Sequence, residues 1–267
     1  MNDSTQSLGT DREIGFGIDI GGSGIKGAPV DLTAGEFLAR RLRLPTPEES
    51  TPGAVGAILG QIVANFDVPA DVPLGVTFPG VVRHHVIATA ANMHPDWVET
   101  NLAEVVREHT GRAAHIINDA DAAGYAEMRY GAAKDAPGVV LVLTLGTGIG
   151  SALIHQGTLV PNTELGHLIM DGDSAEKIAA SGVKDKMGWT YEEWAVQLQR
   201  YLEHVELLFS PDLIVLGGGV SRDHDLFIPL LRTRAPIVPA HLRNKAGIIG
   251  AAIMAAEAEP DAPSATD

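Results

Sequence analysis

The chain has 267 residues, a mass of 28.0 kDa and a formal net charge of −15, from 19 Lys+Arg against 34 Asp+Glu. Apolar residues make up 45% of it, enough for a real core in one large domain or two smaller ones. The absence of cysteine excludes disulfides, thiolate nucleophiles, iron–sulfur clusters and cysteine-ligated zinc. So acidic a chain is a poor general binder of nucleic acid, because neutralising phosphates supplies most of that affinity.

The start of the sequence has no apolar core like that of a signal peptide, and no apolar run approaches the ~20 residues of a membrane span. We therefore expect a cytoplasmic protein with neither a membrane nor a nucleic acid as its partner. The two ends, 1–13 and 258–267, are polar or acidic, and we expect them to be flexible tails.

The first half of the chain alternates apolar strands with helices. The strand from Glu13 to Ile20 leads into a glycine turn at 21–24, and Thr51 with Pro52 behind it is a typical helix start. The predicted elements are strand 13–20, hairpin arms near 26–32 and 37–44, helix 51–66, strand 72–78, helix 101–110, strand 113–117 and helix 120–129.

The second half repeats this order. Its most apolar strand, 139–145, runs into the glycine-rich turn 146–150, and Thr190 with Glu193 forms a capping-box pattern. The predicted elements are strand 139–145, hairpin arms 151–155 and 158–160, helix 190–209, strand 213–216 and helix 247–257. Strand, glycine turn, hairpin and helix thus occur twice, which predicts a mixed-sheet α/β fold of two similar halves with a cleft between them.

Three glycine-rich turns follow apolar strands, at 21–24, 146–150 and 217–219. Glycine lets backbone N–H groups approach a phosphate closely, although a single such turn is equally typical of ordinary chain reversal. Three of them at strand ends favour a nucleotide or phosphate site. The GxGxxG match at 22–27 does not indicate a dinucleotide motif, because Pro29 and Val30 continue as strand where a helix should begin.

Several polar residues near strand ends are candidates for chemistry. Asp19 could organise a magnesium shell or simply cap its turn. Asn118 and Asp119 precede a predicted helix, where Asn or Asp is a preferred cap, yet a carboxylate there could also accept a proton from a substrate hydroxyl. Glu164 and His167 form the sole Glu-x-x-His sequence, and such a pair can hold vicinal sugar hydroxyls.

Taken together, these segments resemble the ROK family (repressors, uncharacterised open reading frames and kinases) over about residues 14–256. The resemblance depends on the order and spacing of short motifs, namely DIGGSGIK at 19–26, FPG at 78–80, ND at 118–119, LTLGTGIG at 143–150, ELGH at 164–167, LGGG at 216–219 and AGIIGAA at 246–252. It implies an α/β fold of two ribonuclease-H-like lobes of the actin/hexokinase type with a central cleft. The implied lobes are 14–118 plus 247–257, and 119–246.

The resemblance also implies roles for individual residues. Asp119 would be the general base for the 6-hydroxyl of a sugar, and no protein ligand to a metal is implied. The implied sugar contacts are Asn118, Asp119, Glu164, His167, Gly80 and Glu193, although the capping box with Thr190 is a sufficient reason for the last. The implied phosphate and nucleotide contacts are Asp19, Gly21, Gly22, Ser23, Gly24, Lys26, Thr144, Gly146, Thr147, Gly148, Gly217, Gly218 and Gly219.

Two departures from the family pattern narrow the resemblance. The stretch 168–188 lacks the cysteines of the usual zinc site, so no structural zinc is expected, and Ser151 replaces an apolar residue. These features, with EKIAASGVKDK at 176–186, are similar to the branch of bacterial glucokinases that use inorganic polyphosphate as well as ATP. That branch implies phosphorylation of glucose, and of mannose, with Mg²⁺ accompanying the donor, in a monomer or homodimer.

Two other functions stay open at this point. One is an ATP-only kinase for another hexose or amino sugar. The other is a sugar sensor without catalysis, although the short segment before the first strand argues against the added DNA-binding domain of the family's repressors. A polyphosphate chain would need a basic track, for which the candidates are Lys26, Arg83, Lys184 and Lys186. Residues 14–256 still carry a charge of −9, so use of such a donor should depend on salt and Mg²⁺.

Overall fold

The computed structural model describes residues 13–90 and 93–258, so most of both predicted tails lies outside the described residues. A six-stranded sheet has the order β3-β2-β1-β5-β8, with β4 pairing β2, and a five-stranded sheet has the order β11-β10-β9-β14-β15. The first sheet contains β1 (Ile14–Gly21), β2 (Gly24–Asp31), β3 (Glu36–Phe37), β4 (Leu42–Leu44), β5 (Leu74–Phe78) and β8 (His115–Asn118). The second contains β9 (Val139–Leu145), β10 (Ile149–His155), β11 (Thr158–Val160), β14 (Leu213–Gly217) and β15 (Ile237–Pro239).

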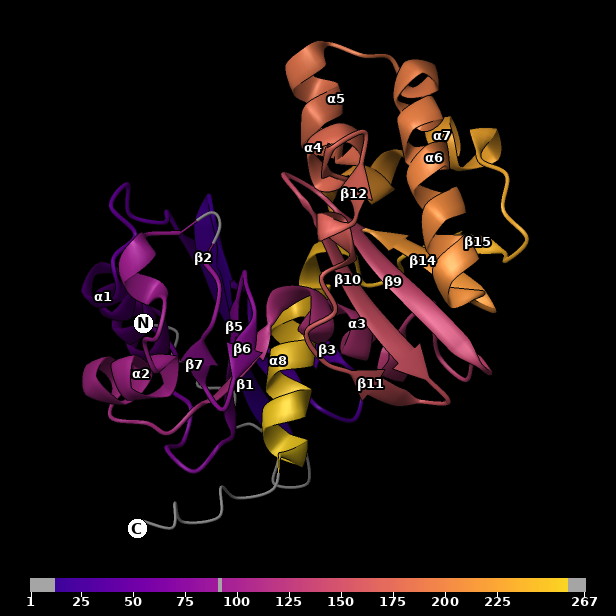
Figure 1. Ribbon diagram of the computed structural model, residues 1–267. Helices are drawn as coiled ribbons and strands as arrows, with labels where there is room; N and C mark the ends of the chain where they lie inside the picture. The colour runs from indigo at the N-terminus through magenta and orange to yellow at the C-terminus, as the bar shows by residue number, and fades with distance from the viewer. Residues whose placement is uncertain (1–12, 91–92, 259–267) are drawn as a thin grey trace, which may run out of the picture.

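Helices cover the outer faces of the sheets and fill the space between them (Figure 1). The α-helices are α1 (Pro52–Ala64), α2 (Leu102–Thr110), α3 (Asp119–Tyr130), α4 (Glu176–Ala179), α5 (Ser181–Met187), α6 (Tyr191–Phe209), α7 (His224–Phe227) and α8 (Ala246–Glu257). The 3₁₀ turns are η1 (Pro95–Trp97), η2 (Leu165–His167), η3 (Gly219–Asp223), η4 (Ile228–Leu230) and η5 (Arg243–Lys245). Two short hairpins complete the description, β6 (Val82–Arg83) with β7 (Val86–Ile87) and β12 (Ile169–Met170) with β13 (Asp173–Ser174).

The first sheet has a different helix layer on each face. Phe16, Ile18 and Ile20 of β1 point to one side, into a core shared with α1 and α2. The alternate residues of β1 face α8, and a Cβ added at Gly17 would lie 1.9 Å from the Ile248 carbonyl oxygen. Glycine at this position therefore lets helix α8 lie directly on the strand.

The second sheet is built in the same way. One face packs against the apolar side of α6, including Trp194 and Leu198, and the other packs against α3. Helices α3 and α8 then pack on each other in the centre of the molecule. Their approach is close, because a Cβ on Gly250 would lie 1.8 Å from the carbonyl oxygen of Ala122. We propose the predicted lobe boundaries for the folded chain, with α8 as the inner layer of the first lobe and α3 as that of the second.

The parallel strands of both sheets decide where a ligand can bind. Strands β1, β5 and β8 run parallel, as do β9, β14 and β15, while β2 and β10 return antiparallel. Residues that follow the carboxyl ends of parallel strands share one edge of their sheet, where α/β proteins bind ligands. The predicted motifs of both halves follow such strand ends.

The predicted elements are confirmed with shifts of one or two residues at most ends. One difference is the arm predicted at 37–44, which forms two short strands, β3 and β4, that pair with different parts of β2. Another is the stretch 165–188, where the sequence predicted no element and the chain forms η2, a hairpin and helices α4 and α5. Neither region has a long apolar period, so tertiary packing decides its conformation.

Candidate active site

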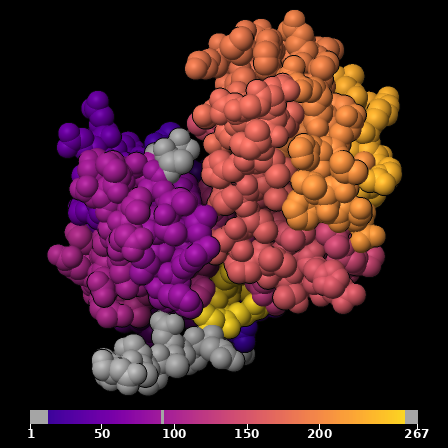
Figure 2. All heavy atoms as spheres, in the orientation of Figure 1, coloured from indigo at the N-terminus to yellow at the C-terminus, as the bar shows by residue number. Residues whose placement is uncertain are grey.

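A cavity of about 560 Å³ lies where the strand ends of the two sheets face each other, within the usual size range for small-molecule sites. Figure 2 shows the two halves of the molecule side by side, the first indigo to purple and the second salmon to orange. Thirteen of the predicted site residues line the cavity: Gly21, Gly22, Ser23, Gly80, Asn118, Asp119, Thr144, Gly146, Thr147, Gly148, Glu164, His167 and Gly218.

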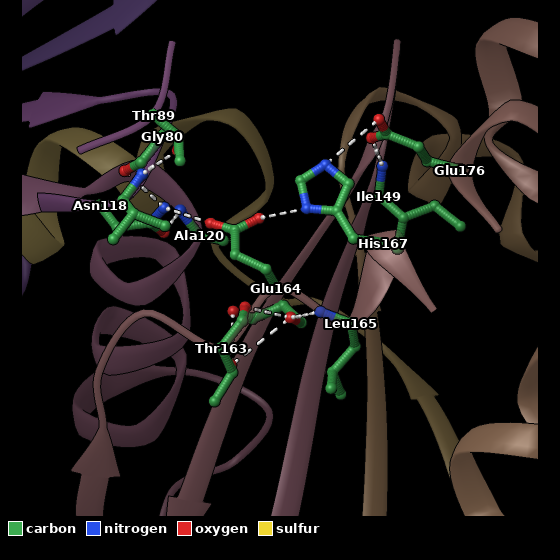
Figure 3. Close-up of polar contacts among 12 residues, drawn as sticks. Gly80, Thr89, Asn118, Ala120, Ile149, Thr163, Glu164, Leu165, His167 and Glu176 are labelled. Carbon is green, nitrogen blue, oxygen red and sulfur yellow. Dashed lines mark hydrogen bonds and ion pairs between the residues drawn. The ribbon is translucent and has the colours of Figure 1, made fainter. Parts of the chain in front are cut away.

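Asn118 ties three parts of the site together. Its Oδ1 accepts hydrogen bonds from the N–H groups of Ala120 at 2.8 Å and Asp121 at 3.0 Å, so it is the N-cap of α3. Its Nδ2 donates to the Gly80 carbonyl at 3.0 Å and to Glu164 Oε1 at 3.4 Å (Figure 3). The capping role expected for the Asn118–Asp119 pair belongs to Asn118, which leaves Asp119 to face the cavity.

Asp119 is the first residue of α3, and its Oδ1 accepts the Ala120 N–H at 2.8 Å. Burial raises the pKa of this carboxyl to about 7, and the negative charges of Asp19, Glu164 and Asp121 act in the same direction. A carboxyl group with a pKa near neutrality is suited to accept a proton at physiological pH.

Three side chains form the opposite wall of the cavity (Figure 3). His167 lies between two carboxylates, with Nδ1 3.8 Å from Glu164 Oε2 and Nε2 3.6 Å from Glu176 Oε1. Burial raises the pKa of Glu164, while the nearby His167 lowers it. The wall thus presents two carboxylates and an imidazole, which can accept from and donate to neighbouring hydroxyl groups.

Ser151 shapes the loop that carries Glu164. Its hydroxyl donates to the Thr163 carbonyl and accepts the Leu165 N–H at 3.0 Å. An apolar residue at this position could make neither bond. The departure from the family pattern at Ser151 therefore has a structural reason in the loop next to the site.

A second set of bonds holds the same loop to the first half of the chain. Asn162 accepts the Val82 N–H with Oδ1 and donates to the Val82 carbonyl with Nδ2, each at 2.9 Å. The Asn162 N–H donates to Asp121 Oδ2 at 2.7 Å, and Asp121 is only 2% exposed. Burial raises the pKa of Asp121 to about 7. These bonds join residues near Gly80, the start of α3 and the loop of Glu164 into one unit.

Asp19 lies on the α8 side of β1, close to the cavity. Its Oδ1 accepts the Thr77 hydroxyl at 3.0 Å, and its Oδ2 pairs with Lys26 Nζ at 3.1 Å. A Cβ on Gly247 would lie 3.2 Å from Asp19 Cγ, so the start of α8 is adjacent. No group of three or more metal-ligating side chains occurs in the described part of the chain. Asp19 alone nevertheless fits a magnesium ion, because Mg²⁺ commonly binds one or two carboxylates together with substrate phosphates and water.

The glycine turns of the second half present backbone groups to the cavity. A Cβ on Gly148 would lie 2.3 Å from Glu176 Oε2, and Gly218 has a φ of 84° and would bring a Cβ 2.2 Å from the Leu145 carbonyl oxygen. A side chain is therefore excluded by the backbone at Gly218, and at Gly148 it would displace the Glu176 carboxylate, so glycine keeps both positions open to a phosphate. Gly217 and Gly219 flank Gly218 and do not line the cavity themselves.

Other predicted residues lie outside the cavity lining. Gly24 and Lys26 belong to the β1–β2 turn and β2, just behind Ser23. Glu193 accepts the Thr190 N–H at 2.9 Å in an exposed capping box at the start of α6. Glu176 lines the cavity without having been predicted there. Nothing in its local sequence marks it, because its approach to His167 depends on the path of residues 168–175.

The comparisons with known proteins show the fold and the family of the chain. The fold is the mixed α/β fold of sugar kinases of the actin/hexokinase type, with its cavity between two lobes. The family model of the ROK family matches residues 15–185, and the chain belongs to the ROK family. No helix in the described ranges is both long enough and apolar enough to cross a membrane.

Individual relatives match over nearly the whole chain. Polyphosphate glucokinase of Mycobacterium tuberculosis is 53% identical over 91% of this chain and 92% of its own. The crystal structure of the inorganic polyphosphate/ATP-glucomannokinase of Arthrobacter sp. strain KM has a TM-score of 0.88 at 50% identity, covering 91% of this chain and 98% of that one. A ROK family glucokinase from Streptomyces griseus, in complex with glucose and AMPPNP, shares the fold at 24% identity with a TM-score of 0.78 over 92% of this chain and 100% of its own.

Proposed function

We propose that the protein phosphorylates glucose, and also mannose, at the 6-hydroxyl group, with inorganic polyphosphate or ATP as the phosphoryl donor. The names of the Mycobacterium and Arthrobacter relatives, at 53% and 50% identity, support this substrate set. The single observation that carries the proposal is the placement of Asp119 in one cavity with two kinds of binding surface. These are the carboxylate and imidazole wall around His167 and the backbone turns that begin at Gly21 and Gly146.

The proposed reaction needs one proton transfer. The Asp119 carboxylate accepts the proton of the sugar 6-hydroxyl while that oxygen forms a bond to the terminal phosphorus of the donor. The bond from this phosphorus to the bridging oxygen breaks, and the shortened polyphosphate or ADP leaves with its electron pair. Such a transfer has a loose transition state, so positioning and charge stabilisation supply most of the catalysis.

The residues around Asp119 perform the positioning. Asn118 fixes the distance between the start of α3, Gly80 and Glu164 through its four hydrogen bonds. The wall of Glu164, His167 and Glu176 offers paired acceptors and a donor for adjacent ring hydroxyls. Asp19 would hold Mg²⁺, which when bound neutralises charge on the donor phosphates.

A coupled assay of hexose 6-phosphate formation tests the proposal. Glucose and mannose are each supplied with ATP or polyphosphate, with Mg²⁺ present or withheld. We expect turnover of both sugars with both donors, and its loss without Mg²⁺. Turnover with ATP alone would favour the rival ATP-only kinase, and the absence of turnover with every pair would refute the proposed function.

A further inference from the structure

An arginine outside the predicted site lies against the first phosphate turn. Arg43 of β4 is exposed, and its Nη2 donates to the Ser23 carbonyl oxygen at 2.9 Å. A Cβ on Gly24 would lie 2.7 Å from both Nε and Nη2 of Arg43. The guanidinium group therefore lies on the backbone of the β1–β2 turn, next to the residue that lines the cavity.

The pairing of the strands explains this position. Asp19 is opposite Lys26 in the β1–β2 pair, and Lys26 is opposite Arg43 in the β2–β4 pair. Residues opposite each other in antiparallel strands point to the same face, so the three side chains form a row across the sheet. Lys26 is neutralised by Asp19 at 3.1 Å, whereas no carboxylate among the described residues pairs with Arg43.

Further cations lie next to Arg43, just before the start of β4 and in η5, on the side away from the β1–β2 turn. Arg41 lies two residues before Arg43, so the two share a face of the chain at β4, while Leu42 and Leu44 pack against the core. Arg41 Nη1 donates to the Asn244 carbonyl at 2.8 Å, which brings the 3₁₀ turn η5 alongside. That turn contributes two more exposed cations at its ends, Arg243 and Lys245.

Two of the four track candidates suggested by the sequence, Lys26 and Lys184, are less available. Lys26 is in the ion pair with Asp19. Lys184 pairs with Asp185 at 2.7 Å, lies 4.7 Å from the ring centroid of Tyr191, and is only 14% exposed at its side chain. By contrast, the two arginines at β4 and the two cations of η5 have no carboxylate partner among the described residues. Four such cations close together are a notable local concentration in a chain of net charge −15.

We propose that Arg43 and Arg41, together with the cations of η5, bind the phosphate groups of an inorganic polyphosphate chain that extends out of the phosphate turn. This inference rests on the proposed function and names the residues that hold its polymeric donor. Guanidinium groups suit this task because their planar donors match phosphate oxygens in pairs. ATP ends after three phosphates, so it has less need of cations beyond the turn.

The test compares two double variants that remove the same charge, Arg41→Ala/Arg43→Ala and Lys184→Ala/Lys186→Ala. Each is assayed with glucose as acceptor and with long-chain polyphosphate, tripolyphosphate or ATP as donor. For the arginine variant we expect the KM for long-chain polyphosphate to rise about tenfold or more. The factor by which the KM for ATP rises should be at least tenfold smaller, so the KM for ATP should hardly change. The salt dependence of polyphosphate use should also weaken, since fewer cation–phosphate contacts remain. The single variant Arg43→Lys keeps the positive charge, so its KM for long-chain polyphosphate should rise less than that of the double arginine variant.

Wild-type turnover with polyphosphate is measured first. This order distinguishes a failure of the proposed function from a failure of the proposed role of the arginines. If the wild type does not use polyphosphate at all, the proposed function is wrong in its donor. If the wild type uses polyphosphate, three outcomes would each overturn the proposed role of the arginines while leaving the proposed function intact. These are an equal loss of activity with all three donors, no loss in the arginine variant, and a selective loss with polyphosphate in the lysine variant.

Discussion

Lowering the pH from 8 to 6 should reduce kcat/KM for glucose about tenfold. The structure raises the pKa of Asp119 to about 7, chiefly through burial and then through the charge of Asp19. A base with this pKa is about 90% deprotonated at pH 8 and about 10% at pH 6, and only the deprotonated form accepts the sugar proton. A carboxyl group with its ordinary pKa would stay ionised over this range and give no such decline.

The assay is a pH series of kcat/KM for glucose at saturating donor and constant ionic strength. Two variants identify the titrating group. The residual activity of Asp119→Asn should lack the acidic limb, and Asp121→Asn should move its midpoint to lower pH, because the negative charge of Asp121 helps to raise the pKa of Asp119. A flat profile from pH 8 to 6, or a limb that survives in Asp119→Asn, would refute the assignment of Asp119 as the base.

Three substitutions have further measurable consequences. Asp119→Asn should lower kcat by roughly 10²–10⁴-fold. It should also raise the melting temperature at pH 8, because the variant has no charge to bury at this position. This gain in melting temperature should shrink below pH 7, because the wild-type carboxyl, whose pKa is raised from 3.8 to about 7, is then protonated in the folded state. Asn162→Gly keeps the backbone φ of 59° accessible but removes two hydrogen bonds to Val82. The free energy of unfolding should therefore fall by about 1–3 kcal/mol, and the KM for glucose should rise. An unchanged KM would show that these bonds do not position the loop that carries Glu164. Gly250→Ala would place a Cβ 1.8 Å from the Ala122 carbonyl oxygen and should destabilise the fold by about 3 kcal/mol or more, whereas an unchanged urea midpoint would contradict the close contact of α3 and α8.

Local chemistry determines much of the site independently of tertiary contacts. Glycines after apolar strands predict open turns, and a polar pair between strand and helix places Asn118 and Asp119 at a strand end. These features depend on neighbours within a few residues, so a sequence pattern can report them. The same holds for the capping box of Glu193, whose bonds lie within one helical turn.

Residues whose role depends on a distant partner were not predictable in this way. Glu176 reaches His167 only because a hairpin returns the chain to the cavity, and Asn162 meets Val82 from the other half of the molecule. Arg43 lies on the phosphate turn because β4 pairs with β2 in one particular register.

The sequence and the tertiary structure determined different properties of this protein. The sequence by itself determined that the chain is acidic and cysteine-free, that it alternates strands and helices twice, and that its glycine turns suit phosphate. The tertiary structure decided that one cavity unites the strand ends of both sheets, and which of the few cations remain unpaired beside it. The physical reason is that hydrogen bonding and capping act over a few residues, whereas register and helix crossing bring together groups that are about 40 to 200 residues apart in the chain.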